Sequence, residues 1–203
     1  MIKVSRLETD NELKAGIESL TSIFIEEYPY YSTWIEKNMH QFYSGEKQIL
    51  KVLDNQNNQL LGYIMIHFSS MNIVKINGIY IFEENKGKGI AKQALTNLCE
   101  LLKQVNVDLI YVQTRLDNNA VAHLFDKTGF KLIGTNYHNV EQRNNWVACR
   151  NLNNIIIDEQ NIAGQIYDGF TALDGEGILN LREQHKTGNL ILRKAKKEDK
   201  KEN

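Results

Sequence analysis

The chain has 203 residues, of which 42% are hydrophobic, and its formal net charge is −1. This length and composition fit one domain with a real core, or one domain and an appendage. The balanced charge argues against a nucleic-acid or membrane partner, and no apolar run approaches the roughly 20 residues that a spanning helix needs.

The start of the chain and its cysteines indicate a cytoplasmic protein. Residues 1–10 lack the apolar centre of a secretory signal. Cys99 and Cys149 are far apart and fit neither a disulfide framework nor a CxxC site, so a reduced pair is favoured over one disulfide. No His, Cys and carboxylate cluster has the spacing of metal ligands, so no metal is expected.

The first third of the chain predicts a strand followed by two helices. Residues 2–7 alternate as a strand does, and Thr9 with Glu12 fits a capping box before apolar residues at helical spacing. Pro29 is expected to break this first helix. The apolar residues of the second helix are Trp34, Ile35, Met39 and Phe42, and we expect the helix to end near residue 44.

Three strands are expected next. Residues 47–54 and 59–68 predict a hairpin around the turn at 55–58, and residues 72–82 predict a third long strand. Gly78 lies inside that strand, which indicates a β-bulge or a close approach of another backbone; a simple packing gap is an equal alternative.

The region after residue 89 predicts helix, strand, helix and two closing strands. An amphipathic helix precedes a strongly apolar strand at 107–114, and a short helix then stops at Gly129. Residues 130–135 and 145–150 predict the closing strands, which puts Tyr137 and His138 in the loop between them. The order β-α-α-β-β-β-α-β-α-β-β predicts an α/β fold, an α+β mixed sheet with helices packed against it.

Residues 151–203 differ from the rest and predict an extension to a domain at 1–150. Residues 177–195 read as strand, turn and strand, and residues 193–203 hold six basic and three acidic residues. A solvated tail is favoured over an electrostatic grip on RNA or an acidic protein. A weaker hypothesis is that the extension completes a homodimer through an exchanged hairpin.

Residues 84–95, ENKGKGIAKQAL, place glycines and lysines directly before an amphipathic helix. Gly87 and Gly89 remove side chains that would block backbone N–H groups, and they permit positive φ. The helix N-terminus directs further N–H groups and its positive dipole end at the same place, while Lys86 and Lys88 add charge. Because strand, glycine loop and helix follow in order, the pattern favours a diphosphate site over a solvated basic turn. The glycine spacing does not match GxGxxG. The pattern is not a P-loop either, because no GK[ST] follows.

Two motifs in this order resemble the GCN5-related N-acetyltransferases. Their first signature is Arg or Gln, two residues, Gly, one residue, then Gly or Ala, and here Lys86, Gly89 and Ala91 match it with Lys in first place. The second is Asn, then Leu-Tyr, then Gly-Phe, which appears as Asn118, Leu124-Phe125 and Gly129-Phe130. The resemblance covers residues 1 to about 150 and is nearest to the ribosomal-protein N-terminal acetyltransferases.

The resemblance implies acetyl-CoA as co-substrate and direct attack on it by a primary amine of a protein, peptide or small molecule. Asn118 would hold the thiol end of the coenzyme. Its pyrophosphate would bind backbone N–H groups of Lys86, Gly87, Lys88, Gly89, Ile90 and Ala91, and its pantetheine arm would pair with the strand edge at Ile79, Tyr80 and Ile81. The acceptor amine would lie at the junction of the first two helices, with Glu26, Glu27, Tyr30 and Tyr31. Carboxylates and rings there suit a cation, although solvent-facing glutamates beside half-buried rings are an equal alternative.

Both customary proton carriers of that branch are absent. Gln113 stands where the base would be and cannot take a proton at neutral pH, and Phe125 stands in place of the acidic Tyr. Tyr80, Tyr137 and His138 are the replacement candidates, together with Tyr111, although each is more often a structural or solvated residue. The same absence favours a second hypothesis, a CoA-binding sensor or interaction module with little turnover.

Overall fold

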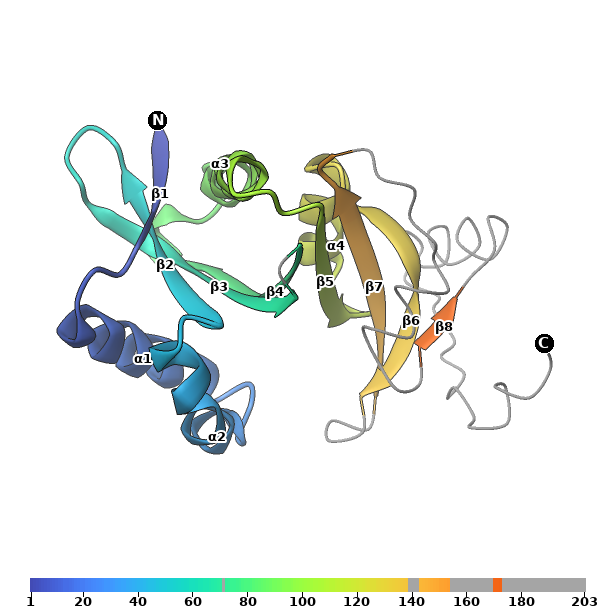
Figure 1. Ribbon diagram of the computed structural model, residues 1–203, viewed down its shortest axis with the longest axis horizontal. Helices are drawn as coiled ribbons and strands as arrows, with labels where there is room; N and C mark the ends of the chain where they lie inside the picture. Colours follow the sequence, from blue (N-terminus) through green and yellow to red (C-terminus); the bar gives the residue numbers. More distant parts are fainter. Residues whose placement is uncertain (71, 139–142, 154–169, 173–203) are drawn as a thin grey trace. The chain divides into compact units, whose positions relative to one another are not determined.

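The computed structural model describes residues 1–70, 72–138, 143–153 and 170–172, which fall into two compact units, Met1–Val107 and Asp108–Asn203 (Figure 1). The first unit contains β1 (Ile2–Arg6), α1 (Asp10–Phe24), α2 (Tyr31–Tyr43), β2 (Lys47–Asp54), β3 (Leu60–Ser70), β4 (Ile73–Ile81), the 3₁₀ turn η1 (Glu83–Asn85) and α3 (Ile90–Gln104). The second contains β5 (Leu109–Arg115), α4 (Asn119–Lys127), β6 (Lys131–His138), β7 (Arg143–Asn151) and β8 (Phe170–Ala172). This order confirms the predicted α/β fold.

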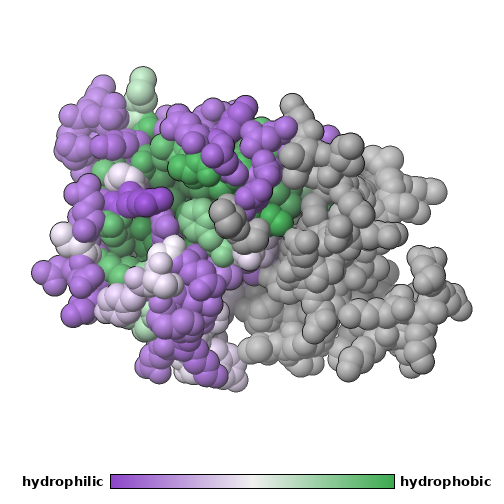
Figure 2. Space-filling model, in the orientation of Figure 1, coloured by the Kyte–Doolittle hydropathy of each residue, from purple (hydrophilic) through white to green (hydrophobic). Residues whose placement is uncertain are grey.

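In the first unit, β1, β2, β3 and β4 pair in chain order, each antiparallel to the next. Helices α1 and α2 pack against β2, and α3 packs against β1 and β4. Figure 1 shows α1 and α2 on one side of these strands and α3 on the other. In Figure 2, hydrophobic residues of this unit (green) show through between hydrophilic ones (purple).

The core beneath α1 and α2 follows from the apolar spacing of both helices and the alternation of the strands. Its buried members are Leu20, Ile35, Phe42, Ile49, Tyr63 and Met65. Each such side chain stabilises the fold by about 1.5–3 kcal/mol. Since Ile49, Tyr63 and Met65 come from β2 and β3, they identify the sheet face that α1 and α2 cover.

The predicted capping box is present at the start of α1. The Thr9 hydroxyl accepts a hydrogen bond from the Glu12 N–H at 3.2 Å, and the Glu12 carboxylate accepts one from the Glu8 N–H at 2.6 Å. The carboxylate thus satisfies the N–H of the residue before the cap rather than that of the cap itself. Helix α1 ends at Phe24, ahead of Pro29.

In the second unit, β7 pairs with β5 and with β6, and β8 pairs with β6, all antiparallel. Gly129, with φ +82°, ends α4 as predicted. Strand β8 comes from the predicted extension, whereas the predicted hairpin at 177–195 and the Lys-rich end lie outside the described residues.

The prediction that Tyr137 and His138 lie in a loop is wrong. They are the last residues of β6, and they pair with Asn144 and Arg143 of β7. Pairing with β7 extends β6 beyond the apolar residues that predicted it, because strand formation depends on neighbouring strands as well as on propensity.

The structure also describes the two cysteines and the lengths of the helices. Cys99 and Cys149 are both buried, and neither forms a disulfide. Among the described residues, the longest helices are too short and too polar to cross a bilayer.

Candidate functional site

The turn between η1 and α3 has the backbone that the glycines predict. Gly87 and Gly89 both have φ +73°, a conformation that L side chains rarely adopt, and a Cβ added at either would meet nothing within 4 Å. The positive φ, and not a lack of space for a side chain, is therefore the reason for glycine at both positions. The space beside them is open.

The N-terminus of α3 presents unpaired N–H groups to this space. The first helical hydrogen bond runs from the Gln93 N–H to the Gly89 carbonyl at 3.2 Å, so the N–H groups of Ile90, Ala91 and Lys92 have no acceptor within the helix. Gly89 is the N-cap and has no side chain to satisfy them. These donors, with the helix dipole, form an anion-binding geometry.

Asn85 adds a donor that the sequence did not single out. It is 8% exposed, and its Nδ2 is buried without a hydrogen-bond partner among the described residues. An unsatisfied buried amide is uncommon and calls for a ligand or water. Its place directly before the glycine turn is consistent with a phosphate nearby.

The two lysines of the turn are paired with its own residues. Lys86 Nζ lies 2.5 Å from Glu83 Oε2, and the hydrogen bond to this carboxylate raises the pKa of Lys86. Lys88 Nζ donates to the Glu84 carbonyl at 2.7 Å. Because an exposed ion pair contributes about 0–1 kcal/mol, Lys86 can turn to a phosphate at small cost.

Strand β4 carries the bulge that Gly78 indicated. Met65 of β3 pairs with Gly78, but Ile66 pairs with Ile76, so Asn77 is the extra residue. Asn77 Oδ1 is buried and lacks a partner within the described part of the chain. A Cβ on Gly78 would meet nothing within 4 Å, so open space adjoins the bulge.

The end of β4 connects the bulge to the glycine turn. Ile81 is buried, whereas Ile79 and Tyr80 are half-buried. The Tyr80 ring packs edge-on against Phe24 and Phe82, with centroids 5.9 Å away in each case. Tyr80 is therefore part of an aromatic wall under α1.

The predicted acceptor residues divide into exposed and buried members. Glu26 and Glu27 are exposed in the turn after α1, and Tyr30 is 69% exposed. Tyr31 packs against Phe24 and Trp34, and its hydroxyl is buried with no partner among the described residues. Burial raises the pKa of Tyr31.

In the second unit, the described candidates lie on β5 and at the start and middle of α4. Asn118 is the N-cap of α4, and its Oδ1 accepts from the Val121 N–H at 3.2 Å. Phe125 is 1% exposed and packs against Phe130 and Trp146. Tyr111 is buried, and Gln113 is half-buried on β5. The side chains of Tyr137 and His138 lie outside the described residues.

A glycine turn with positive φ at a helix N-terminus, after a bulged strand, is a backbone geometry suited to the phosphate of a ligand. The profile of the acetyltransferase (GNAT) family matches residues 17–130, more than half of the chain. The chain therefore belongs to the GNAT family of acetyltransferases, which are N-acetyltransferases with acetyl-CoA as co-substrate. No curated protein matches the sequence.

Solved structures with a similar fold include spermidine N-acetyltransferases from Vibrio cholerae. One, in complex with CoA and spermine, is 18% identical with TM-score 0.58, over 74% of this chain and 95% of that one. Another, the N152L mutant, is 15% identical with TM-score 0.60, over 74% and 94%. At this identity the likeness shows the fold alone. The family match and these structures do not place the chain in the ribosomal-protein branch.

The residues present fit the diphosphate of the coenzyme. The open turn leaves room for it, and the unpaired N–H groups of α3 and the buried amide of Asn85 offer hydrogen-bond donors. Among the described residues, no group of three His, Cys, Asp or Glu side chains is placed to hold a metal ion.

Proposed function

We propose that this protein transfers the acetyl group of acetyl-CoA to a primary amine, and that the amine attacks directly in a ternary complex. The observation that carries the proposal is the glycine turn at the N-terminus of α3, with φ +73° at both Gly87 and Gly89. Acetyl-CoA supplies an activated acyl group. Backbone N–H groups from Lys86 to Ala91 hold its pyrophosphate, and the β4 edge at Ile79 to Ile81 pairs with its pantetheine arm.

Positioning is the main contribution of the chain's residues. The acceptor must be neutral to attack, although a lysine-type amine titrates near about 10.4 and an α-amino group near about 8. Bringing the reacting groups together can lower the barrier by about 7–11 kcal/mol. A backbone N–H at the Asn77 bulge would donate to the developing oxyanion, and Asn118 would donate its amide N–H to the coenzyme.

The general acid and the general base are proposed from a short set of residues. Phe125 is buried in the core, so the position that holds the family's acid is structural here. Tyr80, Tyr137 and His138 stay the candidates for acid or base, and Tyr80 ranks last among them because its ring packs against Phe24 and Phe82. The acceptor would approach the α1–α2 junction, where Glu26, Glu27 and Tyr30 are exposed and Tyr31 is half-buried. Spermidine, the substrate in the names of the similar structures, and peptides are both amines of the right class.

A CoA-binding sensor with little turnover is the second candidate, and the apolar Phe125 favours it. Thiol release from acetyl-CoA, measured with spermidine, lysine, N-terminal peptides and amino acids, separates the two. Release above the enzyme-free background with at least one amine, with intersecting initial-rate patterns and no acylated protein by intact mass, supports the ternary-complex enzyme. Binding of CoA with background release for every amine would instead support the sensor.

A further inference from the structure

His67 of β3 is an imidazole that the sequence did not single out, and it lies on the sheet face that α1 and α2 cover. It is opposite Lys47 of β2 and Lys75 of β4. Met65, two residues earlier on β3, belongs to the core under both helices. Because residues two apart on a strand project to the same face, the His67 side chain projects to that face as well. The side chain is 21% exposed, so a ligand or water can reach it.

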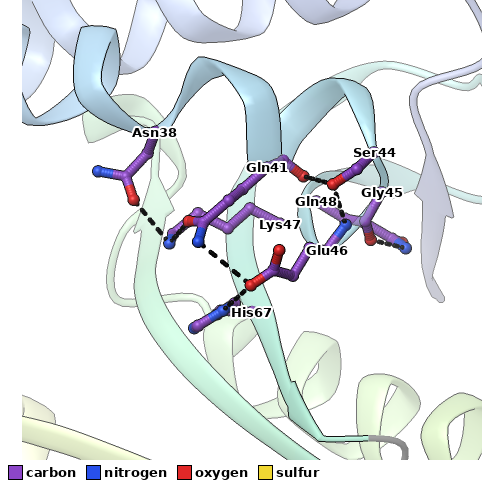
Figure 3. A network of polar contacts seen from close by, with 8 residues as sticks. All are labelled: Asn38, Gln41, Ser44, Gly45, Glu46, Lys47, Gln48 and His67. Atoms are coloured by element: carbon purple, nitrogen blue, oxygen red, sulfur yellow. Dashed lines mark hydrogen bonds and ion pairs between the residues drawn. The ribbon is translucent and has the colours of Figure 1, made fainter.

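A carboxylate orients this imidazole. Glu46 Oε1 lies 3.1 Å from His67 Nε2, and it also accepts a hydrogen bond from Gln41 Nε2 at 3.1 Å (Figure 3). The Glu46 carbonyl accepts a hydrogen bond from the Phe68 N–H at 2.8 Å, so main chain and side chain both fix Glu46 beside the ring. A carboxylate at one ring nitrogen favours the tautomer that carries its proton there. The pair therefore leaves Nδ1 of the neutral imidazole to accept a proton.

Helix α2 supports the carboxylate through a second set of hydrogen bonds. Lys47 Nζ donates to Gln41 Oε1, and to Asn38 Oδ1 at 2.9 Å (Figure 3). Burial lowers the pKa of the Lys47 ammonium, and the negative charge of Glu46 opposes that shift. Gln41 is thus held by Lys47 at its oxygen and donates to Glu46 from its nitrogen. A base whose orienting group is itself held in place is the arrangement that general-base catalysis uses.

The imidazole is next to the bulge of β4. Met65, the neighbour of His67 on the same face of β3, pairs with Gly78. Residues two apart on a strand are separated by about 7 Å, and neighbouring strands by about 4.8 Å. His67 and Gly78 are therefore diagonal neighbours, at the about 7–8 Å that long side chains can span. A Cβ at Gly78 would meet nothing within 4 Å, so open space adjoins the bulge on the face to which His67 projects.

The same face connects His67 with the residues proposed for the acceptor. Lys47, which lies opposite His67, has its Nζ 5.5 Å from the centroid of the Trp34 ring. The Trp34 ring stacks on that of Tyr31, with centroids 5.8 Å apart. Tyr31 is one of the residues proposed to bind the amine. The imidazole is thus linked to the proposed acceptor site and adjoins the bulge proposed to bind the oxyanion.

Resting on the acetyltransferase function proposed above, we propose that His67 is the general base of the acetyl transfer and that Glu46 is its positioning residue. The neutral amine forms an N–C bond with the thioester carbon, and the C–S bond breaks. His67 Nδ1, directly or through one water, accepts the proton that the amine nitrogen loses. The departing thiolate takes a proton from the general acid or from solvent, and the imidazolium returns its own to solvent. The products are one amide and one thiol.

Turnover of His67→Gln tests the base role. The acceptor is the amine that gives the fastest thiol release from acetyl-CoA in the panel described above. We expect kcat to fall by about 100-fold or more, as the loss of a general base does. CoA affinity by calorimetry and the midpoint of urea unfolding should stay close to those of wild type. His40→Gln is the matched control, because His40 is an exposed histidine of α2, and it should keep the wild-type kcat.

Chemical rescue distinguishes a base from a structural residue. His67→Ala removes the ring, and free imidazole added to this variant should raise kcat by about tenfold or more above the enzyme-free rate. The same imidazole should not raise kcat of wild type or of His67→Gln.

Glu46→Gln tests the positioning role. The amide cannot stabilise the imidazolium as a carboxylate does, so kcat should fall by about tenfold or more. KM should stay unchanged, because Glu46 acts through the ring and does not touch the amine.

The outcomes separate this proposal from the proposed function. Wild-type kcat in His67→Gln, or a loss in His67→Ala that imidazole does not restore, overturns the base role and leaves the acetyltransferase function intact. If the His67 variants do not fold, Glu46→Gln decides, since its side chain is 44% exposed, and wild-type kcat in this variant overturns the positioned base. Background thiol release by the wild type with every amine overturns the proposed function and the base role together.

Discussion

Lys86 Nζ lies 5.6 Å from the centroid of the Tyr80 ring, so the glycine turn and the end of β4 are in contact. The ring also packs against Phe24 and Phe82. Tyr80 thereby links the strand proposed to pair with pantetheine to the turn proposed to bind pyrophosphate.

This packing predicts that the Tyr80 ring matters more than its hydroxyl. We expect Tyr80→Phe to retain kcat within about threefold, since the ring still packs. Loss of a general acid would instead lower kcat by about 100-fold or more. Tyr80→Ala should lower the free energy of unfolding by about 2 kcal/mol, since a half-buried ring is lost. Steady-state kinetics and urea unfolding check both. A drop of 100-fold in kcat for Tyr80→Phe at unchanged KM would instead identify the hydroxyl as the acid.

Gly62 allows β3 and β4 to lie close together because it has no side chain. A Cβ at Gly62 would lie 2.1 Å from the Tyr80 carbonyl oxygen, a clash with backbone that no side-chain rotation relieves. We expect Gly62→Ala to destabilise the protein by more than about 2 kcal/mol. Gly78→Ala, where the Cβ meets open space, is the comparison in the same sheet and should change stability by less than about 1 kcal/mol. Urea unfolding of the two variants measures the difference, and equal effects would contradict the account.

Lys75 predicts a rise in stability with pH. Its folded pKa of about 8 is below the unfolded value of 10.5, so between these pH values the unfolded state binds more protons and the free energy of unfolding increases. The increase is at most about 3 kcal/mol, and partial exposure reduces it. In phosphate-free buffer, the difference in unfolding free energy between wild type and Lys75→Met should change between pH 8 and 10.5 and stay constant from pH 6 to 7. A difference that is flat from pH 7 to 10.5 would show that the ammonium is not desolvated.

The fold and the glycine turn could be predicted because their signals are local. Thr9 and Glu12 cap α1 through neighbouring residues, Gly129 ends α4, and Gly87 and Gly89 adopt the positive φ that their pattern requires. Gly78 correctly indicated a bulge, although the extra residue is Asn77. Each of these features depends on a few consecutive residues.

Other features depend on which strands pair and in what register. The strand at Tyr137 and His138 is formed by pairing with β7 and not by its own propensity. Lys47, His67 and Lys75 are up to 28 positions apart in the sequence, and only the β2–β3–β4 register aligns them. The unsatisfied Asn85 amide is likewise apparent only once the turn has folded.

The central claim is that main-chain donors around two glycines hold the pyrophosphate of CoA, and calorimetry with CoA tests it most directly. Gly45 has φ +79° and open space around a Cβ, as Gly87 and Gly89 have, but it follows α2 and lies outside the turn. Alanine at each of these positions should therefore cost a similar 1–2 kcal/mol of backbone strain. We predict that wild type and Gly45→Ala bind CoA alike, and that the double variant Gly87→Ala, Gly89→Ala binds it at least tenfold more weakly. Absence of CoA binding by the wild type, or equal affinity in the double variant, would contradict the account.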